Sequence, residues 1–264
     1  MPNEALAAGR GSRVDEWAEV VDVTVRVWNV ENGLCVRELA GHSDTVFRMA
    51  LSPDGDVLAS ASADGTVRFW SLSSGKELLK LDAVKEHSFA YGIDFFPSGK
   101  ELASFGSDGT VRIFDAASGE ELRKWEIERA TFNVAISPDG RRVACSRLMA
   151  VQIFDAATGV SQGALMFMPD AGLFARINAL AWTPDGLSIL AADGSEEDPL
   201  RPAPVGFAFE SSQSIRVWDA SSGKPLAKYV GHVNAINDVA VSRDGKTLVS
   251  ASADGSIRYW KMPD

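Results

Sequence analysis

Two sets of residues in this chain combine a histidine, a serine and an aspartate at the same spacing. The serine follows the histidine by 18 positions and the aspartate follows it by 22: His42, Ser60 and Asp64, then His232, Ser250 and Asp254. These are the residue types of a hydrolytic triad, and histidine with aspartate can also hold a metal ion. A tryptophan comes six positions after each aspartate, at Trp70 and Trp260.

The repetition of the set favours a structural role over a catalytic one. A catalytic constellation needs to occur only once, and the chain has only three histidines for any metal site. A buried imidazole and a buried carboxylate need hydrogen-bond partners to offset the cost of leaving water, and the serine and tryptophan can supply them. A G-x-S-x-G nucleophile motif is also absent from the sequence. We therefore expect no catalytic residue, no cofactor and no bound metal.

The elements that must position these residues are short strands. The stretch 52–70, SPDGDVLASASADGTVRFW, alternates apolar and small residues between two turn signals, Pro53-Asp54-Gly55 and Asp64-Gly65. The stretch 242–260 repeats it as SRDGKTLVSASADGSIRYW. Each stretch predicts three antiparallel strands joined by two tight turns.

Weaker copies of the same stretch occur between these two and before them. The aromatic residue that ends each copy recurs about every forty residues, at Trp28, Trp70, Phe114, Phe154, Trp218 and Trp260. A period near forty with four strand signals per unit is typical of a bladed propeller. The sequence therefore predicts an all-β fold, a β-propeller of four-stranded antiparallel blades, with six repeats of which the first and last are incomplete.

The repeat resembles the WD-repeat β-propeller family over essentially the whole chain. Gly41-His42 with Asp64 and Trp70, and Gly231-His232 with Asp254 and Trp260, match the repeat signature of that family. The resemblance implies that each histidine bonds to a strand serine and the turn aspartate, with the tryptophan packed beside it. It therefore implies a structural network of His42, Ser60, Asp64 and Trp70, and a second of His232, Ser250, Asp254 and Trp260.

Three places depart from the repeat. Nine extra residues, including Asp15, Glu16 and Trp17, separate the second and third strands of the first unit. A loop at 193–214, rich in proline and acidic residues, is inserted at the corresponding place in the fourth complete-frame repeat. In the third repeat, Leu148-Met149 replaces the Asp-Gly turn. Long irregular loops in a compact repeat are usually functional or disordered.

The ends of the chain leave two repeats short of a strand. The first unit lacks its innermost strand and the last lacks its outermost. We expect a single propeller domain over 1–264, and we expect either that residues upstream of Met1 are missing or that the chain is part of a longer protein. If the chain is complete, its open strand edges invite self-association.

The net charge, the cysteine content and the N-terminal sequence limit which partners the protein is expected to bind and where in the cell it is expected to be. The net charge of −10 makes general nucleic-acid binding unfavourable. Cys35 and Cys145 occupy non-equivalent repeat positions, so a disulfide framework is not expected. The N-terminus does not read as a secretory signal, and no stretch is long and apolar enough to span a bilayer. We expect a cytoplasmic protein with no membrane partner.

The most plausible recognition surface is the rim where the inner strands begin. Counting six positions back from each turn proline, or from Arg243 in the last unit, gives Phe47, Tyr91, Phe132, Asn178 and Asn237. The family resemblance implies that this rim receives peptides. Neighbouring positions that would surround it are Thr45, Phe89 and Arg176. Aromatic residues on adjacent blades could hold an aliphatic or cationic side chain, or they could simply plug the channel mouth.

The sequence therefore favours a non-enzymatic interaction scaffold that binds a protein or peptide at the rim that carries the long loops. Asp15, Glu16, Glu19, Glu196, Glu197 and Asp198 would make these loops acidic, which favours a basic partner. Two alternatives stay open: a sensory or regulatory propeller domain of a larger enzyme, and a propeller-based hydrolase or metal-dependent enzyme.

Overall fold

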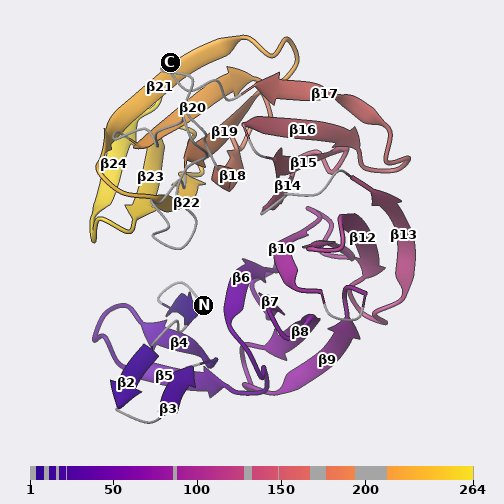
Figure 1. Ribbon diagram of the computed structural model, residues 1–264, viewed down its shortest axis with the longest axis vertical. Helices are drawn as coiled ribbons and strands as arrows, with labels where there is room; N and C mark the ends of the chain where they lie inside the picture. The colour runs from indigo at the N-terminus through magenta and orange to yellow at the C-terminus, as the bar shows by residue number, and fades with distance from the viewer. Residues whose placement is uncertain are drawn as a thin grey trace. The chain divides into compact units, whose positions relative to one another are not determined.

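The computed structural model shows an all-β chain in the part that it describes (Figure 1). It describes residues 23–85, 88–127, 133–147, 149–166, 177–193 and 213–263, together with the backbone of 4–8, 12–15 and 18–21. The contacts divide the chain into two compact units, 1–129 and 130–264. Each unit is described by itself.

The first unit holds a three-stranded sheet, two four-stranded sheets and a separate two-stranded hairpin. The strands of the three-stranded sheet and the hairpin are β1 (Glu4–Ala8), β2 (Ser12–Asp15), β3 (Ala18–Val21), β4 (Val25–Asn29) and β5 (Cys35–Leu39). The strands of the four-stranded sheets are β6 (Val46–Leu51), β7 (Val57–Ser62), β8 (Thr66–Ser71), β9 (Glu77–Asp82), β10 (Ala90–Phe95), β11 (Glu101–Gly106), β12 (Thr110–Asp115) and β13 (Glu121–Glu126).

The second unit holds two four-stranded sheets and a three-stranded sheet. The strands of the four-stranded sheets are β14 (Val134–Ile136), β15 (Arg142–Arg147), β16 (Ala150–Asp155), β17 (Ser161–Met166), β18 (Ile177–Trp182), β19 (Ser188–Asp193), β20 (Gln213–Asp219) and β21 (Pro225–His232). The three-stranded sheet consists of β22 (Ile236–Val241), β23 (Thr247–Ser252) and β24 (Ile257–Lys261).

These sheets confirm the predicted architecture, a propeller of four-stranded antiparallel blades. In each complete blade, consecutive strands pair antiparallel in chain order, as in β6-β7-β8-β9. Four blades are complete, whereas the sheets β1-β4-β5 and β22-β23-β24 have three strands each among the described residues. No helix in the described part of the chain could span a membrane.

Tight turns connect the strands because serine, aspartate and glycine satisfy the turn backbone locally. The Ser52 hydroxyl donates to Asp54 Oδ1 at 2.6 Å and accepts a bond from the Val57 amide at 2.9 Å. Gly55 has a φ of 80°, which glycine adopts without steric cost. Met149 takes a φ of 58° in the altered turn of the third repeat, where Gly65 has 83° in the regular one. A left-handed conformation costs a residue with a β-carbon about 1–2 kcal/mol.

Two short strands, β2 and β3, lie at the place of the insertion in the first repeat. Strands β2 and β3 pair antiparallel, with Ser12 opposite Val21 and Asp15 opposite Ala18, and they belong to no blade. On either side of the hairpin, β1 and β4 pair as second and third strands. The sequence located this insertion, but it did not predict strands within it.

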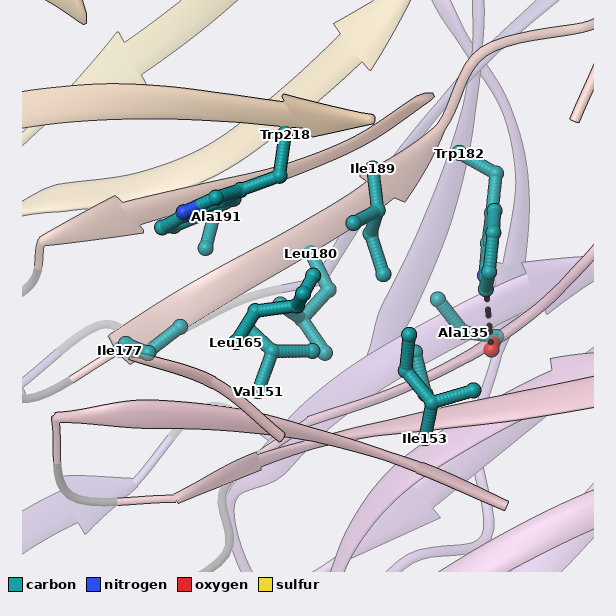
Figure 2. Close-up of a cluster of buried hydrophobic side chains, with 11 residues drawn as sticks. Ala135, Val151, Ile153, Leu165, Ile177, Leu180, Trp182, Ile189, Ala191 and Trp218 are labelled. Carbon is teal, nitrogen blue, oxygen red and sulfur yellow. Dashed lines mark hydrogen bonds between the residues drawn. The ribbon is translucent and has the colours of Figure 1, made fainter. Parts of the chain in front are cut away.

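Apolar side chains between neighbouring blades form the core. In the first unit, the Phe69 ring packs edge-on against Phe95 of the next blade, with ring centroids 6.0 Å apart. In the second unit, Trp182 packs among side chains from β14 to β20, and its Nε1 donates to the Ala135 carbonyl at 3.2 Å (Figure 2). The Arg142 guanidinium lies 4.5 Å from the Trp182 ring centroid. These contacts pack neighbouring blades of each unit against one another.

Candidate functional site

The first histidine set forms a continuous hydrogen-bonded chain inside the second sheet of the first unit. His42 Nδ1 lies 2.9 Å from Asp64 Oδ2, and His42 Nε2 lies 2.7 Å from Ser60 Oγ. Trp70 Nε1 donates to the same Ser60 oxygen at 2.9 Å. The Thr66 hydroxyl donates to the other Asp64 oxygen at 2.6 Å. The imidazole and the indole therefore satisfy their polar atoms within one blade.

The same distances would fit a catalytic triad, so the surroundings of these side chains must distinguish a catalytic role from a structural one. Ser60 is fully buried and His42 is 5% exposed, which leaves no space for a substrate at the serine oxygen. The indole N–H of Trp70 also occupies a lone pair that a nucleophilic serine would use for attack. The geometry therefore fits a role in stabilising the blade.

Asp64 has a lowered pKa although it is partly buried. Burial alone would raise the pKa, but hydrogen bonds from His42 and Thr66 and from the Ser43 and Thr66 amides favour the charged carboxylate and lower it below the ordinary value. The carboxylate is therefore ionised at neutral pH and holds the imidazole N–H in place.

The second histidine set has the same geometry, with His232 at the end of β21 and its partners in the last sheet and its turn. His232 Nδ1 lies 2.7 Å from Asp254 Oδ2, and His232 Nε2 lies 2.8 Å from Ser250 Oγ, which also accepts a bond from Trp260 Nε1 at 2.8 Å. The Ser256 hydroxyl donates to Asp254 at 2.6 Å, as Thr66 does to Asp64. The hydroxyl residue two positions after each aspartate is a further member of the set that the sequence reading did not include. Its signal was the shared Asp-Gly-Thr/Ser pattern.

The blade built from β10 to β13 uses its turn aspartate differently. Arg112 makes two bonds to Asp108, at 2.6 and 3.2 Å, and the Lys85 amide also donates to this carboxylate. Ser104 occupies the position of Ser60, but its buried hydroxyl has no hydrogen-bond partner among the described residues. The same holds for Thr110, which occupies the position of Thr66. His87, the shifted candidate in the sequence, lies outside the described residues.

Three of the predicted rim residues come together as an aromatic cluster in the first unit. The ring centroids of Phe47 and Tyr91 are 5.0 Å apart, and those of Phe89 and Tyr91 are 6.0 Å apart. Phe47 and Tyr91 are half-buried, whereas Phe89 is 42% exposed. Below, the term rim cluster means Phe47, Phe89 and Tyr91. Thr45 is half-buried and lies two residues before Phe47, immediately before β6 begins.

A β-bulge positions each rim residue that the structure describes. In the pairing of β6 with β7, Val46 lies opposite Ser62 and Arg48 opposite Ala61, so Phe47 is the extra residue. The same irregularity occurs on the inner strands of three further sheets, and it leaves Tyr91, Asn178 and Asn237 as the extra residues. A bulge bends the strand and redirects the side chain of its extra residue. The sequence reading found these positions by counting, but it did not predict the bulge.

The other rim positions are not part of this cluster. Asn178 and Asn237 lie in the second unit, on β18 and β22, where Asn178 is half-buried and Asn237 is exposed. The Asn178 carbonyl accepts a bond from the side chain of buried Asn133 at 3.3 Å. Phe132 and Arg176 lie outside the described residues, as do 194–212 of the inserted loop.

Neither the cysteines nor the acidic residues form a reactive centre in the described part. Cys35 is exposed and Cys145 is buried, and both are free thiols. Burial raises the pKa of the Cys145 thiol, which keeps it protonated. Among the described residues, no group of three or more histidine, cysteine, aspartate or glutamate side chains could hold a metal ion.

Comparisons with known proteins agree with the repeats and the propeller fold described above. The WD40 family model, described as WD domain, G-beta repeat, matches residues 33–71, 78–115 and 223–261. The small ribosomal subunit protein RACK1y of Oryza sativa subsp. japonica is 47% identical over 62 residues, which is 24% of this chain and 18% of that protein. Human Striatin-4 is 25% identical over 228 residues, 85% of this chain and 22% of that protein. The chain thus spans about a fifth of the length of these curated relatives.

A solved structure supports the fold. A chain of the structure titled "Crystal Structure of Mitotic Checkpoint Complex" matches 91% of this chain with a TM-score of 0.71 and 23% identity, and the match covers 71% of that chain. At this identity the likeness shows the fold alone.

Proposed function

Because the chain belongs to the WD-repeat family of β-propellers, we propose that it is a non-enzymatic interaction scaffold that binds a peptide or protein partner at the rim cluster. The observation that carries the proposal is the contact of Phe47, Tyr91 and Phe89 on two adjacent blades, with Phe89 42% exposed. Exposed aromatic clusters supply large, rigid contact area and are common anchors of binding sites.

The charge of the chain supports a partner with a basic side chain. The charge of an arginine or lysine is attracted to the face of an aromatic ring when it lies within about 6 Å of the ring centroid. The net charge of −10 attracts basic segments over longer distances. We therefore propose a peptide whose arginine or lysine lies against the rings of the rim cluster. The acidic loop residues, from Asp15 to Glu19 and from Glu196 to Asp198, would add to this attraction.

The name of one similar protein supports an interaction role. The rice relative is named as a small ribosomal subunit protein. The name places that protein in a multi-component assembly, and we propose the same kind of role here. No observation favours the hydrolase or metal-dependent alternative. A regulatory domain of a larger enzyme would use the same rim.

Three further predictions belong with this proposal. We propose that 1–264 forms one propeller domain and that the full ring has six blades. We also propose that the insertion predicted at 193–214 is a loop between β19 and β20, although its ends, Asp193, Gln213 and Ser214, lie in these two strands. The cytoplasmic location and the possible self-association through strand edges also stay predictions.

The binding proposal can be tested with a displayed library of random peptides selected on the wild-type chain. Selected peptides are expected to contain arginine or lysine, and Tyr91→Ala and Phe47→Ala should each weaken their binding at least about tenfold, since hot-spot aromatics contribute 2 kcal/mol or more. Leu187→Ala is the control, because it removes an exposed apolar side chain from a turn of the second unit. Equal binding by the wild type and both rim variants would refute the proposed site.

A further inference from the structure

A groove of about 700 Å³ lies in the first unit, between the blade built from β6 to β9 and the blade built from β10 to β13. The turns that follow β6 and β10 contribute to it, whereas the rim cluster lies where these two strands begin. The apolar residues that line the groove are Val57, Phe69, Leu78, Leu79 and Phe95, of which Leu78 is 56% exposed. The groove is therefore a separate surface from the rim cluster.

In the second unit, the side chain of Arg142 occupies the equivalent place between two blades. Its guanidinium carbon lies over the Trp182 ring of the next blade, 4.5 Å from the ring centroid. Its Nη2 donates to the Gly186 carbonyl at 2.9 Å, and its Nη1 donates to the Ala220 carbonyl at 3.4 Å. One guanidinium thus binds an aromatic face and two backbone acceptors between neighbouring blades.

The carbonyl of Gly99 corresponds to the first of these acceptors. Gly99 and Gly186 lie in the turns that follow β10 and β18, and both have a φ of 69°. A β-carbon on Gly99 would lie 3.5 Å from Pro53 Cδ. A β-carbon on Gly186 would lie at the same distance from Pro138 Cδ. The turn of the preceding blade therefore packs on both glycines in the same way.

The carbonyl of Ala116 corresponds to the second acceptor. Ala116 directly follows β12, and Ala220 directly follows β20. The Ala116 amide donates to the Lys100 carbonyl at 2.9 Å, and the Ala220 amide donates to the Leu187 carbonyl at 2.8 Å. Gly99 and Ala116 both line the groove of the first unit. This groove therefore has both backbone acceptors.

Two side chains differ between the first unit and the second. Val57 stands at the position of Arg142, because each begins the second strand of its blade and its amide donates to a serine hydroxyl five residues earlier at 2.9 Å. Valine has no polar atom that could reach the two carbonyls. Leu79 takes the place of Gly163, and the groove keeps its volume beside this leucine.

The remaining lining of the groove has the chemistry that a guanidinium requires. Phe95, the last residue of β10, stands at the position of Trp182, the last residue of β18, and supplies an aromatic ring. Asp54, Asp115 and Lys100 also line the groove, so two carboxylates stand against one ammonium group. The net negative charge and the ring both attract a cation.

We propose that this groove binds an arginine side chain presented by a partner peptide or protein. The guanidinium packs against the Phe95 ring and donates to the carbonyls of Gly99 and Ala116, and its methylene groups contact the apolar wall. Arg142 shows the same arrangement within the protein itself. A lysine ammonium fits less well, because it lacks the planar fork that reaches two acceptors. This preference separates the groove from the rim cluster, whose proposed partner carries either cation.

A titration followed by methyl NMR tests the proposal on the 264-residue chain. The probe is a blocked pentapeptide with a central arginine between glycines, and it should cause saturable shifts of the Val57 and Leu78 methyl signals. The same peptide with lysine should bind about fivefold more weakly, the effect of losing one hydrogen bond. Tyr91→Ala removes a ring of the rim cluster, so this control should leave the shifts in the groove unchanged.

Two variants of the groove make the test specific. Val57→Arg should weaken peptide binding at least about tenfold, because its own guanidinium would occupy both acceptors. Val57→Leu is the matched control and should keep the affinity. Phe95→Leu keeps an apolar side chain but removes the ring, and should weaken binding about two- to fivefold. Lack of saturable shifts, equal affinity for the arginine and lysine peptides, or full binding by Val57→Arg and Phe95→Leu would overturn the proposal.

Discussion

Residues 42–70 and 232–260 have similar sequences and the same internal hydrogen bonds, but they lie in different surroundings. In both, a histidine, a serine, an aspartate and a tryptophan form one hydrogen-bonded chain. The strand that ends the first stretch has two neighbours and a buried apolar face, whereas the strand that ends the second has one neighbour among the described residues and an exposed face. The local network therefore follows from the repeat sequence, and the burial follows from what surrounds it.

The largest expected contrast comes from removing equivalent aromatic rings. Phe69→Ala should lower the free energy of unfolding by about 3–5 kcal/mol, because it leaves a cavity in the core. Tyr259→Ala should lower it by less than about 1 kcal/mol, because this ring is 75% exposed. Urea unfolding of both variants measures the contrast. Similar losses in the two would show that the face of β24 is covered in solution.

Replacing the strand serine by alanine should change stability differently in a blade that has the histidine network and in the blade that lacks it. Ser60→Ala should cost about 1–3 kcal/mol, because Trp70 Nε1 and His42 Nε2 would each lose a buried partner. Ser104→Ala should be neutral or stabilising, because it removes a buried hydroxyl that has no partner among the described residues. Thermal unfolding gives both values. A loss from Ser104→Ala as large as that from Ser60→Ala would contradict a structural role specific to the histidine set.

Acid should destabilise the protein through Asp64. The pKa of Asp64 is lower in the folded state than in the unfolded chain, so its stabilising contribution is full above about pH 4 and is lost as the pH falls through the folded pKa. The free energy of unfolding of the wild type should fall between pH 6 and pH 3. In Asp64→Asn this fall should be smaller by about 1–2 kcal/mol. Asp254→Asn should act in the same direction, since Ser256 and His232 lower the pKa of Asp254. Urea midpoints measured across this range would contradict the account if Asp64→Asn kept the full wild-type dependence.

The smallest contrast concerns the two equivalent arginines. Arg68→Ala breaks the ion pair with Glu77 and should cost up to about 1 kcal/mol. Arg258→Ala should have almost no effect on the isolated chain, because no described residue forms an ion pair with it. Thermal unfolding at low and high salt checks both, since only the Arg68 effect should shrink at high salt. Equal effects would show that Arg258 has a partner in solution.

The sequence was sufficient to predict the strands and turns of each repeat. It was insufficient to predict local irregularities and the contacts of long side chains. The spacing of His42, Ser60, Asp64 and Trp70 placed these side chains in one blade, because turn residues and strand alternation fix their register. The bulge at Phe47 could not be predicted, because it lies at the start of β6, where one strand residue precedes it and a shift in the alternation cannot be recognised. The pair between Arg68 and Glu77 also escaped prediction, since it depends on how the long side chains cross the two strands.

The third repeat shows the same limit at its altered turn. The sequence identified Leu148-Met149 as a replacement for Asp-Gly, but it gave no conformation. Met149 keeps the left-handed backbone that glycine adopts in the regular turn, and its side chain packs against the core around Trp182. Tertiary packing thus offsets an unfavourable local conformation, which local sequence cannot show.

Hydrogen exchange of the free protein tests the central comparison most directly. The account predicts that amides on the outer edge of β24, within 257–261, exchange at least about a hundredfold faster than those at equivalent positions in 67–71, because among the described residues only the latter are bonded to a fourth strand. Equal protection of the two segments would contradict it, since the last sheet would then already have its missing neighbour.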